Sequence, residues 1–405
     1  MINKIKSLAK ELKNDVIDIR RQIHQYPRLS FEEYETANLI QSLLTSWNIE
    51  YDLLTETGIV ATIKGRNPEK KTVALRADID ALPIQEKNEC SYKSAVDGVM
   101  HACGHDAHTA MLLGAAKILN QMKDDFEGTI KLIFQPGEEK LPGGASIMIE
   151  KGVLKDVDLI IAQHVYPDLP CGEVGFHAGE FMASCDEINI TIKGKGGHAA
   201  KIKERDNTTV AAAKLLCTIS ELSSEFNKEE RKNPIIIAFG SFIADGTYNV
   251  IPNEVTLKGT MRTFDENDRK IVKNKIKEFC AEIALSFNVE ADLFIEQGYP
   301  VLINDVSLTN SLKNKAIDFM GEENVKDIPQ LMTAEDFAWY SHQTKACMYR
   351  IGTSNVEKGI VSKQHTPTFD IDEDALEIGM GLMAWLAIDN EQLTINNGMA
   401  TNCKL

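Results

Sequence analysis

The chain has 405 residues, of which 43% are apolar and 26% charged, and this mix excludes a mostly disordered or fibrous protein. Its 44 basic and 60 acidic side chains give a net charge of −16, which argues against binding to nucleic-acid phosphates. No stretch approaches the roughly 20 apolar residues of a membrane helix. Because charges interrupt the first segment, Met1–Ile23, and only eight cysteines are present, we expect a cytoplasmic protein with reduced thiols.

The first half of the chain alternates helical and strand patterns. Apolar residues at three- and four-residue steps predict a helix over residues 5–23. Strands are then predicted at residues 59–64, 72–77, 128–135 and 158–162, and helices at residues 107–122 and 144–151. This alternation predicts an α/β fold with a mostly parallel sheet and helices on both faces.

The pattern changes near residue 184. Residues 187–193 alternate apolar and polar side chains, as a half-exposed strand does. The sequence then predicts helices at 207–226 and 266–287, and strands at 235–243, 247–263 and 289–295. The α/β pattern resumes after Gly298-Tyr299-Pro300. We therefore expect a discontinuous α/β domain over residues 1–183 and 296–405, with a smaller α+β domain inserted at residues 184–295.

The densest group of reactive side chains lies at the start of the helix predicted at 107–122. It consists of His101, Cys103, His105, Asp106 and His108, in a chain with only nine histidines. Cys103 and His105 can point into one cleft from a strand-to-helix turn, and thiolate and imidazole are ligands that zinc and its first-row neighbours prefer. The alternative is a helix start capped by Asp106, with histidines lining a core.

A pair of adjacent carboxylates, Glu138 and Glu139, follows the apolar strand that ends at Gln135. Open α/β sheets place their ligands at the carboxyl ends of strands. One carboxylate can bind a metal while its neighbour transfers a proton. Surface Glu-Glu pairs are common, so this pair alone does not distinguish a site from a solvated turn.

Three further side chains lie at strand ends or in a loop. His164 closes the strand at 158–162, Asp80 follows the strand at 72–77, and His365 lies in a loop before a helix predicted at 372–386. A lone histidine at a strand end is usually structural, and Asp80 fits a turn carboxylate as well as a group that orients a ligand histidine. Together they bring metal-binding side chain types to one edge of a sheet.

These motifs, HACGHDAH, QPGEE, QH and QHTPTFDIDEDAL, resemble in order and spacing the hippurate hydrolase and auxin-conjugate (IAA-amino acid) hydrolase branch of the binuclear metallopeptidases. Aminoacylase and carboxypeptidase G belong to the same wider group. The resemblance implies a metallopeptidase catalytic domain with an inserted lid and dimerisation domain, and two divalent metal ions (Zn, Mn, Co or Ni) per chain. The implied ligands are Cys103, His105, Glu139, His164 and His365, with Glu138 as the catalytic carboxylate.

The inserted segment carries GGHAA at 196–200, YNVIP at 248–252 and GTMRTF at 259–264, which look like lid motifs of the same family. By resemblance, His198 stabilises the oxyanion, from its own chain or from the partner subunit of a dimer, and Asn249 and Arg262 hold a substrate carboxylate. An arginine fork matches a carboxylate geometrically, although a surface charge at a strand edge is the alternative. The chain departs from the family at residues 201–205, which read KIKER, and at Thr366, where serine is commoner.

We therefore expect a metal-dependent amidohydrolase that cleaves N-acyl-L-amino acids to a carboxylate and a free amino acid. Metal-activated water would attack, with Glu138 as general base and acid. The expected partners are a small N-acyl amino acid and a second copy of the chain, in a homodimer or homotetramer through the lid domain. The alternatives are a dipeptidase or carboxypeptidase with the same site, or a non-catalytic metal-binding protein, which has no reason to keep Glu138.

Overall fold

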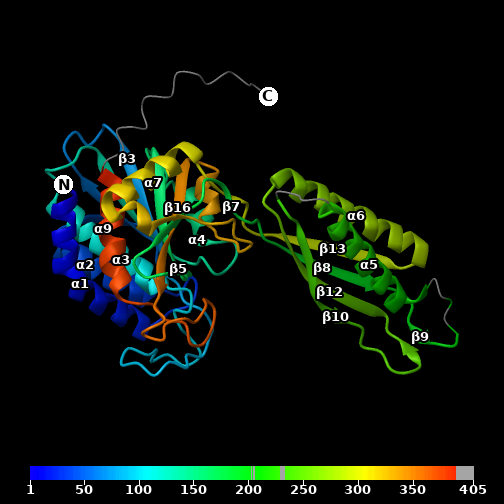
Figure 1. The fold of residues 1–405 in the computed structure, drawn as a ribbon. Coiled ribbons are helices and arrows are strands. Elements are labelled where there is room, and N and C mark those ends of the chain that lie inside the picture. The colour runs from blue at the N-terminus through cyan, green and yellow to red at the C-terminus, as the bar shows by residue number, and fades with distance from the viewer. Residues whose placement is uncertain (202, 204–205, 229–232, 389–405) are drawn as a thin grey trace, which may run out of the picture. The chain divides into compact units, whose positions relative to one another are not determined.

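The computed structural model of the protein describes residues 1–201, 203, 206–228 and 233–388, and it divides the chain into two compact units (Figure 1). The first unit comprises Met1–Gly179, Ile303–Pro329 and Asp336–Leu405, and the second comprises Glu180–Leu302 and Gln330–Glu335. The departure from the family at residues 201–205 lies largely outside the described residues. Within the part of the chain that is described, no helix has the length and apolar character needed to cross a membrane.

The first unit is built from helices around an eight-stranded sheet. Its helices are α1 (Ile2–Gln25), α2 (Tyr34–Ser46), α3 (His105–Gln121), α4 (Gly144–Glu150), α7 (Val306–Met320), α8 (Ala338–Ser341), α9 (Asp374–Ile388) and the 3-10 helix η2 (Glu322–Asn324). The strands follow the order β1 (Glu50–Leu53), β2 (Ile59–Lys64), β4 (Thr129–Gln135), β3 (Thr72–Asp78), β5 (Leu159–Pro170), β16 (Lys345–Ser354), β6 (Val174–Phe176), β15 (Val325–Asp327).

The centre of this sheet is parallel. β3 pairs in parallel with β4 and β5, and β5 pairs in parallel with β16, whereas β1–β2, β2–β4 and β16–β6 are antiparallel. All residues of β3 after the first are buried, and so are most of β16. Strands buried along their whole length are covered on both faces. The prediction of an α/β fold with a mostly parallel sheet is confirmed.

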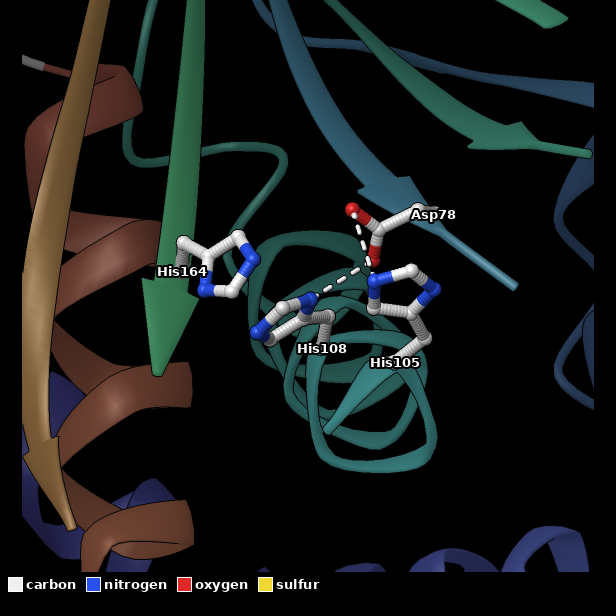
Figure 2. A group of neighbouring side chains, drawn as sticks. All are labelled: Asp78, His105, His108 and His164. Carbon is white, nitrogen blue, oxygen red and sulfur yellow. Dashed lines mark hydrogen bonds and ion pairs between the residues drawn. The ribbon is translucent and has the colours of Figure 1, made fainter. Parts of the chain in front are cut away.

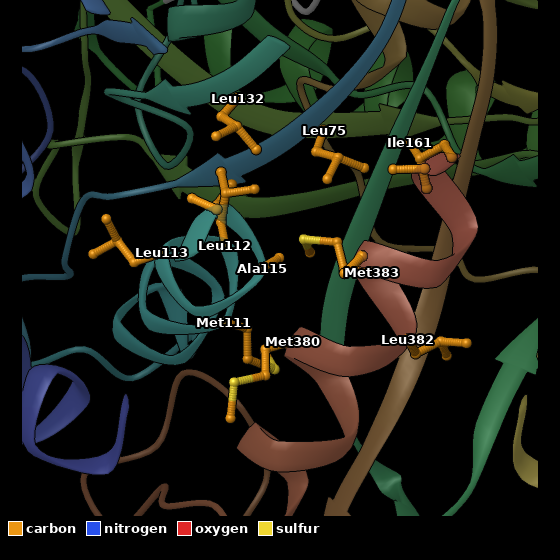
Figure 3. Packing of buried hydrophobic residues seen from close by; sticks show 14 of the residues in the cluster. Leu75, Met111, Leu112, Leu113, Ala115, Leu132, Ile161, Met380, Leu382 and Met383 are labelled. Carbon is orange, nitrogen blue, oxygen red and sulfur yellow. The ribbon is translucent and has the colours of Figure 1, made fainter. Parts of the chain in front are cut away.

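One core holds the site-bearing helix α3 against the sheet. Figure 3 shows Met111, Leu112 and Ala115 of α3 with Leu75 of β3 and Met383 of α9, and all five are fully buried or nearly so. α1, whose apolar residues at three- and four-residue steps are buried, packs against both α3 and α9. The packing therefore fixes the first turn of α3 next to the ends of β3 and β5.

The second unit is a four-stranded antiparallel sheet with two helices, α5 (Thr208–Phe226) and α6 (Glu266–Phe287). Its strand order is β10 (Ile236–Ile243), β12 (Glu254–Arg262), β8 (Asp186–Lys193), β13 (Glu290–Gln297), and a separate pair joins β9 (Gly197–His198) to β11 (Val250–Ile251). Ile188, Ile190 and Ile192 alternate along β8 and are buried with residues of both helices, so one sheet face is covered.

Two details differ from the sequence-based expectations. The strand predicted at 247–263 is two strands, because Pro252, between β11 and β12, has no N–H to donate to a ladder. The second unit also extends beyond 184–295. The Cys185 N–H donates to Tyr299 O and the Ala183 N–H to Leu331 O, so the chain near Tyr299 and Leu331 belongs to this unit. β7 (Gly179–Met182) and β14 (Leu302–Asn304) contain points at which the chain passes between the units.

Two helical leucines of the second unit test its core. Leu215 of α5 is 0% exposed, whereas Leu285 of α6 is 85% exposed. We expect Leu215→Ala to lower the free energy of unfolding of this unit by about 2–5 kcal/mol, because it leaves a cavity. Leu285→Ala is the matched control and should change it by less than about 0.5 kcal/mol. Hydrogen exchange of the β8 amides measures both, and equal costs would contradict this core.

Candidate metal centre

Three parallel strands bring their carboxyl ends to one level of the first unit's sheet. Asp78, the last residue of β3, pairs with Gln135, the last residue of β4. Arg76 of β3 pairs with Ala162 of β5, so Asp78 is level with His164, two residues further along. This register gathers at one edge the side chains that end or follow these strands, among them Asp80, Glu138, Glu139 and His164.

A glycine lets α3 begin at the same edge. Gly104 has a φ of 93°, in the left-handed region, and a Cβ on it would lie 2.5 Å from Val165 Cγ2 of β5. Only glycine tolerates both the conformation and this close approach. Cys103 and His105 therefore flank a turn that lies directly beside β5.

The structure brings the five implied ligands and Glu138 together. The Cys103 Sγ lies 3.7 Å from His164 Nε2. The Glu139 Oε1 lies 3.1 Å from His365 Nε2 and 3.9 Å from His105 Nε2. Donor atoms of Cys103, Glu139 and His365 lie within 4.8 Å of one another, and those of His105, Glu138 and Glu139 form a second such group. Glu139 belongs to both groups.

Hydrogen bonds define which imidazole nitrogens face this cluster. His105 Nδ1 lies 3.0 Å from Asp80 Oδ1, and His164 Nδ1 lies 2.8 Å from the carbonyl oxygen of Val165. Since these oxygens accept, each Nδ1 carries a proton, and in the neutral imidazole each Nε2 presents a lone pair. Among the described residues, the buried His105 Nε2 has no hydrogen-bond partner, and the buried Glu139 Oε1 makes the 3.1 Å ion-pair contact with His365 Nε2 but no hydrogen bond of good geometry. Burying such polar atoms costs free energy of folding unless another group binds them.

The electrostatics of the cluster favour positive charge. Burial lowers the pKa of His105, but the negative charge of Asp78, the interactions with Cys103 and the bond to Asp80 outweigh it and hold that pKa well above its ordinary value. Contacts with Cys103 and Glu139 raise the pKa of His365 to about 10. A proton on either imidazole occupies the lone pair that a metal cation would otherwise accept.

Asp78 and His108 support the proposed ligands through hydrogen bonds, a role that the sequence analysis assigns only to Asp80. Figure 2 shows Asp78 in contact with both His105 and His108, with His164 on the neighbouring strand. His108 Nδ1 donates to Asp78 at 2.6 Å, and Arg76 Nη1 donates to the other Asp78 oxygen at 2.6 Å. The Val165 N–H donates to His108 Nε2 at 2.9 Å. His108 therefore ties the end of β3 to β5.

Asp80 links two members of the cluster. Its side chain, which is 1% exposed, accepts from His105 Nδ1 at 3.0 Å and from the backbone N–H of Glu139 at 3.0 Å. The Ser30 hydroxyl donates to it at 2.7 Å. Burial raises the pKa of Asp80, but these bonds, chiefly the one with His105, outweigh it and lower that pKa below its usual value.

Glu138 is 6% exposed, and the backbone N–H of Asp336 donates to its Oε1 at 3.4 Å. Asp336 is itself fixed, because its side chain accepts from Arg76 Nη2 at 2.8 Å and from the Ala145 N–H at 2.9 Å. No local sequence signal selects Asp336, because the run Ala334-Glu335-Asp336 has the composition of an exposed loop.

His198, Asn249 and Arg262 belong to the second unit. His198 is exposed on β9, where it pairs with Val250, and the backbone carbonyl of Asn249 accepts from the Ala199 N–H at 2.8 Å. The chain segments that carry His198 and Asn249 therefore lie side by side. Arg262 is half-buried at the end of β12, and its Nη1 donates to Met332 O at 3.5 Å.

Known proteins resemble this chain over most of its length. The profile of "Peptidase family M20/M25/M40" matches residues 74–389. The N-acyl-L-amino acid amidohydrolase of Geobacillus stearothermophilus is 39% identical over 301 residues, 74% of this chain and 80% of that protein. The N-acetylcysteine deacetylase of Bacillus subtilis is 36% identical over 375 residues, 92% of this chain and 96% of that protein.

A solved structure agrees. The Bacillus subtilis YXEP protein, a dinuclear metal-binding peptidase of the M20 family, superposes with a TM-score of 0.79 at 33% identity, covering 94% of this chain and 98% of that one. The resemblance found in the sequence is thereby confirmed. Sequence, fold and relatives lead to one assignment: this chain is a hydrolase that belongs to peptidase family M20/M25/M40.

Proposed function

We propose that this chain is a metal-dependent amidohydrolase that cleaves the amide bond of N-acyl-L-amino acids, such as N-acetyl or N-benzoyl conjugates. The products are a carboxylate and a free amino acid. The observation that carries this proposal is the buried Glu138 beside a cluster of thiol, imidazole and carboxylate donors. The similarity to an N-acyl-L-amino acid amidohydrolase and a deacetylase supports the substrate class.

The donor set suits two divalent cations. We propose that they are held by Cys103, His105, Glu139, His164 and His365. Thiolate and imidazole ligands suit zinc, cobalt and nickel, and the carboxylate also suits manganese. The buried His105 Nε2, which has no hydrogen-bond partner among the described residues, fits this role, and so does Glu139 Oε1, which lies between the imidazoles of His365 and His105 at 3.1 and 3.9 Å. When bound, two such cations lower the pKa of a water molecule and polarise an amide carbonyl.

The protein's own groups move the proton and hold the substrate. In this proposal Glu138 takes the proton from the attacking water and delivers it to the leaving amine nitrogen, so no covalent nucleophile is required. His198, whose side chain is exposed, stabilises the oxyanion. Asn249 and Arg262 hold the substrate carboxylate, which a guanidinium can bind through two parallel hydrogen bonds.

We also propose that two or four copies of the chain associate through the second unit. Its sheet ends in the edge strands β10 and β13, and an edge strand can pair with another copy. In such an assembly, His198 would act on substrate bound to its own subunit or on substrate bound to the neighbouring one.

Metal replacement tests the proposed activity. Protein stripped by a chelator is reloaded with zinc, manganese, cobalt or nickel, and amine release is measured from N-acetyl and N-benzoyl amino acids and from dipeptides. We expect no turnover without metal and recovery with at least one of these ions. Calcium is the matched control and should not restore activity, because it prefers oxygen ligands. A preference for dipeptides would indicate a dipeptidase or carboxypeptidase, and no turnover despite two bound ions would contradict the proposal.

Glu138→Gln tests the proton-transfer role. The amide keeps the shape of Glu138 but cannot accept the proton, so kcat should fall by about 10²–10⁴-fold. Metal content, measured by atomic emission, should stay unchanged, because Glu138 is not among the proposed ligands. Glu139→Gln is the control that should reduce metal content. Activity that survives Glu138→Gln would show the mechanism to be wrong.

Asp80→Ala tests the support of two ligands. Because Asp80 accepts from both His105 Nδ1 and the Glu139 N–H, its loss should weaken metal affinity by about 10–100-fold, measured by competition with a chelator. Asp305→Ala is the control. Asp305 accepts from the Leu308 N–H at the start of α7, so its loss should lower stability but leave metal affinity unchanged. Equal affinities in the two variants would contradict this role of Asp80.

A further inference from the structure

A carboxylate that the proposed mechanism does not use lies against the turn that carries Glu138. Glu33, at the N-terminus of α2, is 0% exposed. Its Oε1 accepts from the backbone N–H of Gly137 at 2.8 Å and from that of Phe31 at 2.8 Å. Its Oε2 accepts from the Thr57 hydroxyl at 2.8 Å. Every one of these bonds joins Glu33 to the turn or to segments that surround it.

The turn and the loop that carries Glu33 fit each other closely. Gly137 has a φ of 61°, and a Cβ at this position would collide with the Phe31 ring. Phe31 itself has a φ of 69°, a conformation that a bulky side chain rarely adopts. Such a conformation persists when its surroundings enforce it, and here Glu33 binds the Phe31 N–H.

Two different carboxylates hold the backbone before and after Glu138. Glu33 binds the N–H of Gly137, the residue before Glu138, and Asp80 binds the N–H of Glu139, the residue after it. Asp80 also binds His105, one of the proposed ligands, whereas the hydrogen bonds described for Glu33 involve none of the proposed ligands. The two carboxylates thus support different parts of the site.

We propose that Glu33 is a positioning residue, which aims Glu138 at the reacting water by holding the Gly137 amide. This inference rests on the proposed role of Glu138. Because Glu33 supports the proton-transfer group rather than the proposed ligands, its loss should lower kcat while KM and metal affinity stay unchanged. The position requires an acceptor oxygen. Glutamine supplies one to both backbone N–H groups, and its amide can donate to the Thr57 hydroxyl.

The experiment compares Glu33→Ala with Glu33→Gln in the metal-loaded full chain. For Glu33→Ala we expect kcat to fall by about 10–100-fold, since small misplacement of a reacting group has effects of this size. KM and metal affinity by chelator competition should stay within about twofold, because no proposed ligand loses a bond. Hydrogen exchange, measured by mass spectrometry on the peptide that contains Gly137, should speed up about 10-fold or more, as a protecting bond is lost. Glu33→Gln should restore all of these values.

Asn304→Ala is the matched control. Asn304 is buried in the same unit and holds the backbone of Met348 through two bonds, at 2.7 and 2.9 Å. Its loss should lower stability without changing kcat or exchange at Gly137. If Glu33→Ala does not fold, Thr57→Val removes only the bond to Oε2. The exchange rate at Gly137 should then rise, and kcat should fall, by about 2- to 10-fold, the change expected when one hydrogen bond is lost.

Three results would overturn the inference: a Glu33→Ala protein with wild-type kcat, a Glu33→Gln protein as slow as Glu33→Ala, or unchanged exchange at Gly137. The exchange result does not depend on turnover. An unmodified protein that hydrolyses no N-acyl amino acid would therefore refute the proposed function alone, while exchange at Gly137 would still decide whether Glu33 holds the turn.

Discussion

The first unit depends on the compensation of negative charge that is buried at one edge of its sheet. Asp78, Asp80 and Asp336 are each almost completely buried, and a carboxylate removed from water is stable only when it is paired and hydrogen-bonded. Arg76, which is 1% exposed, donates to both Asp78 and Asp336. His108 donates to the other Asp78 oxygen, and Ser30, His105 and backbone N–H groups donate to Asp80 and Asp336. The paired carboxylates become rigid acceptors that hold backbone and imidazole groups in place.

This compensation leaves a defined set of donors for other chemistry. Both nitrogens of the His108 imidazole form hydrogen bonds: Nδ1 donates to Asp78, and Nε2 accepts from the Val165 N–H. In contrast, Nε2 of His105 is buried without a hydrogen bond among the described residues, and Oε1 of Glu139 contacts only imidazole nitrogens of the proposed ligands there. At this edge of the sheet, some side chains support the fold and others are suited to binding a cation. Both kinds come from the same short segments of sequence.

The sequence identifies those candidate residues of the site that have a local signal. The cluster from His101 to His108 stands out because reactive side chains are concentrated there, and His164 and Glu139 stand out because they end or follow apolar strands. The α/β class followed from alternating patterns. These residues are close in space because parallel strands share one carboxyl edge, which sequence patterns can anticipate.

The supporting residues could not be found in this way, because their partners are distant along the chain. Glu33 lies 104 residues from Gly137, and Asp336 lies 260 residues from Arg76. In the sequence both belong to short acidic runs that resemble solvated loops. The split of the strand predicted at 247–263 had a local signal in Pro252, but a short strand pair is hard to distinguish from one long strand.

The position of β16 has a consequence for biosynthesis. This strand lies between β5 and β6 in the first unit's sheet, yet its residues, Lys345–Ser354, follow the whole second unit in the chain. During translation, all residues of the second unit's core are therefore synthesised before the first unit's sheet can be completed. His365 emerges later still, so a nascent chain gathers the full donor cluster only after the second unit has been synthesised.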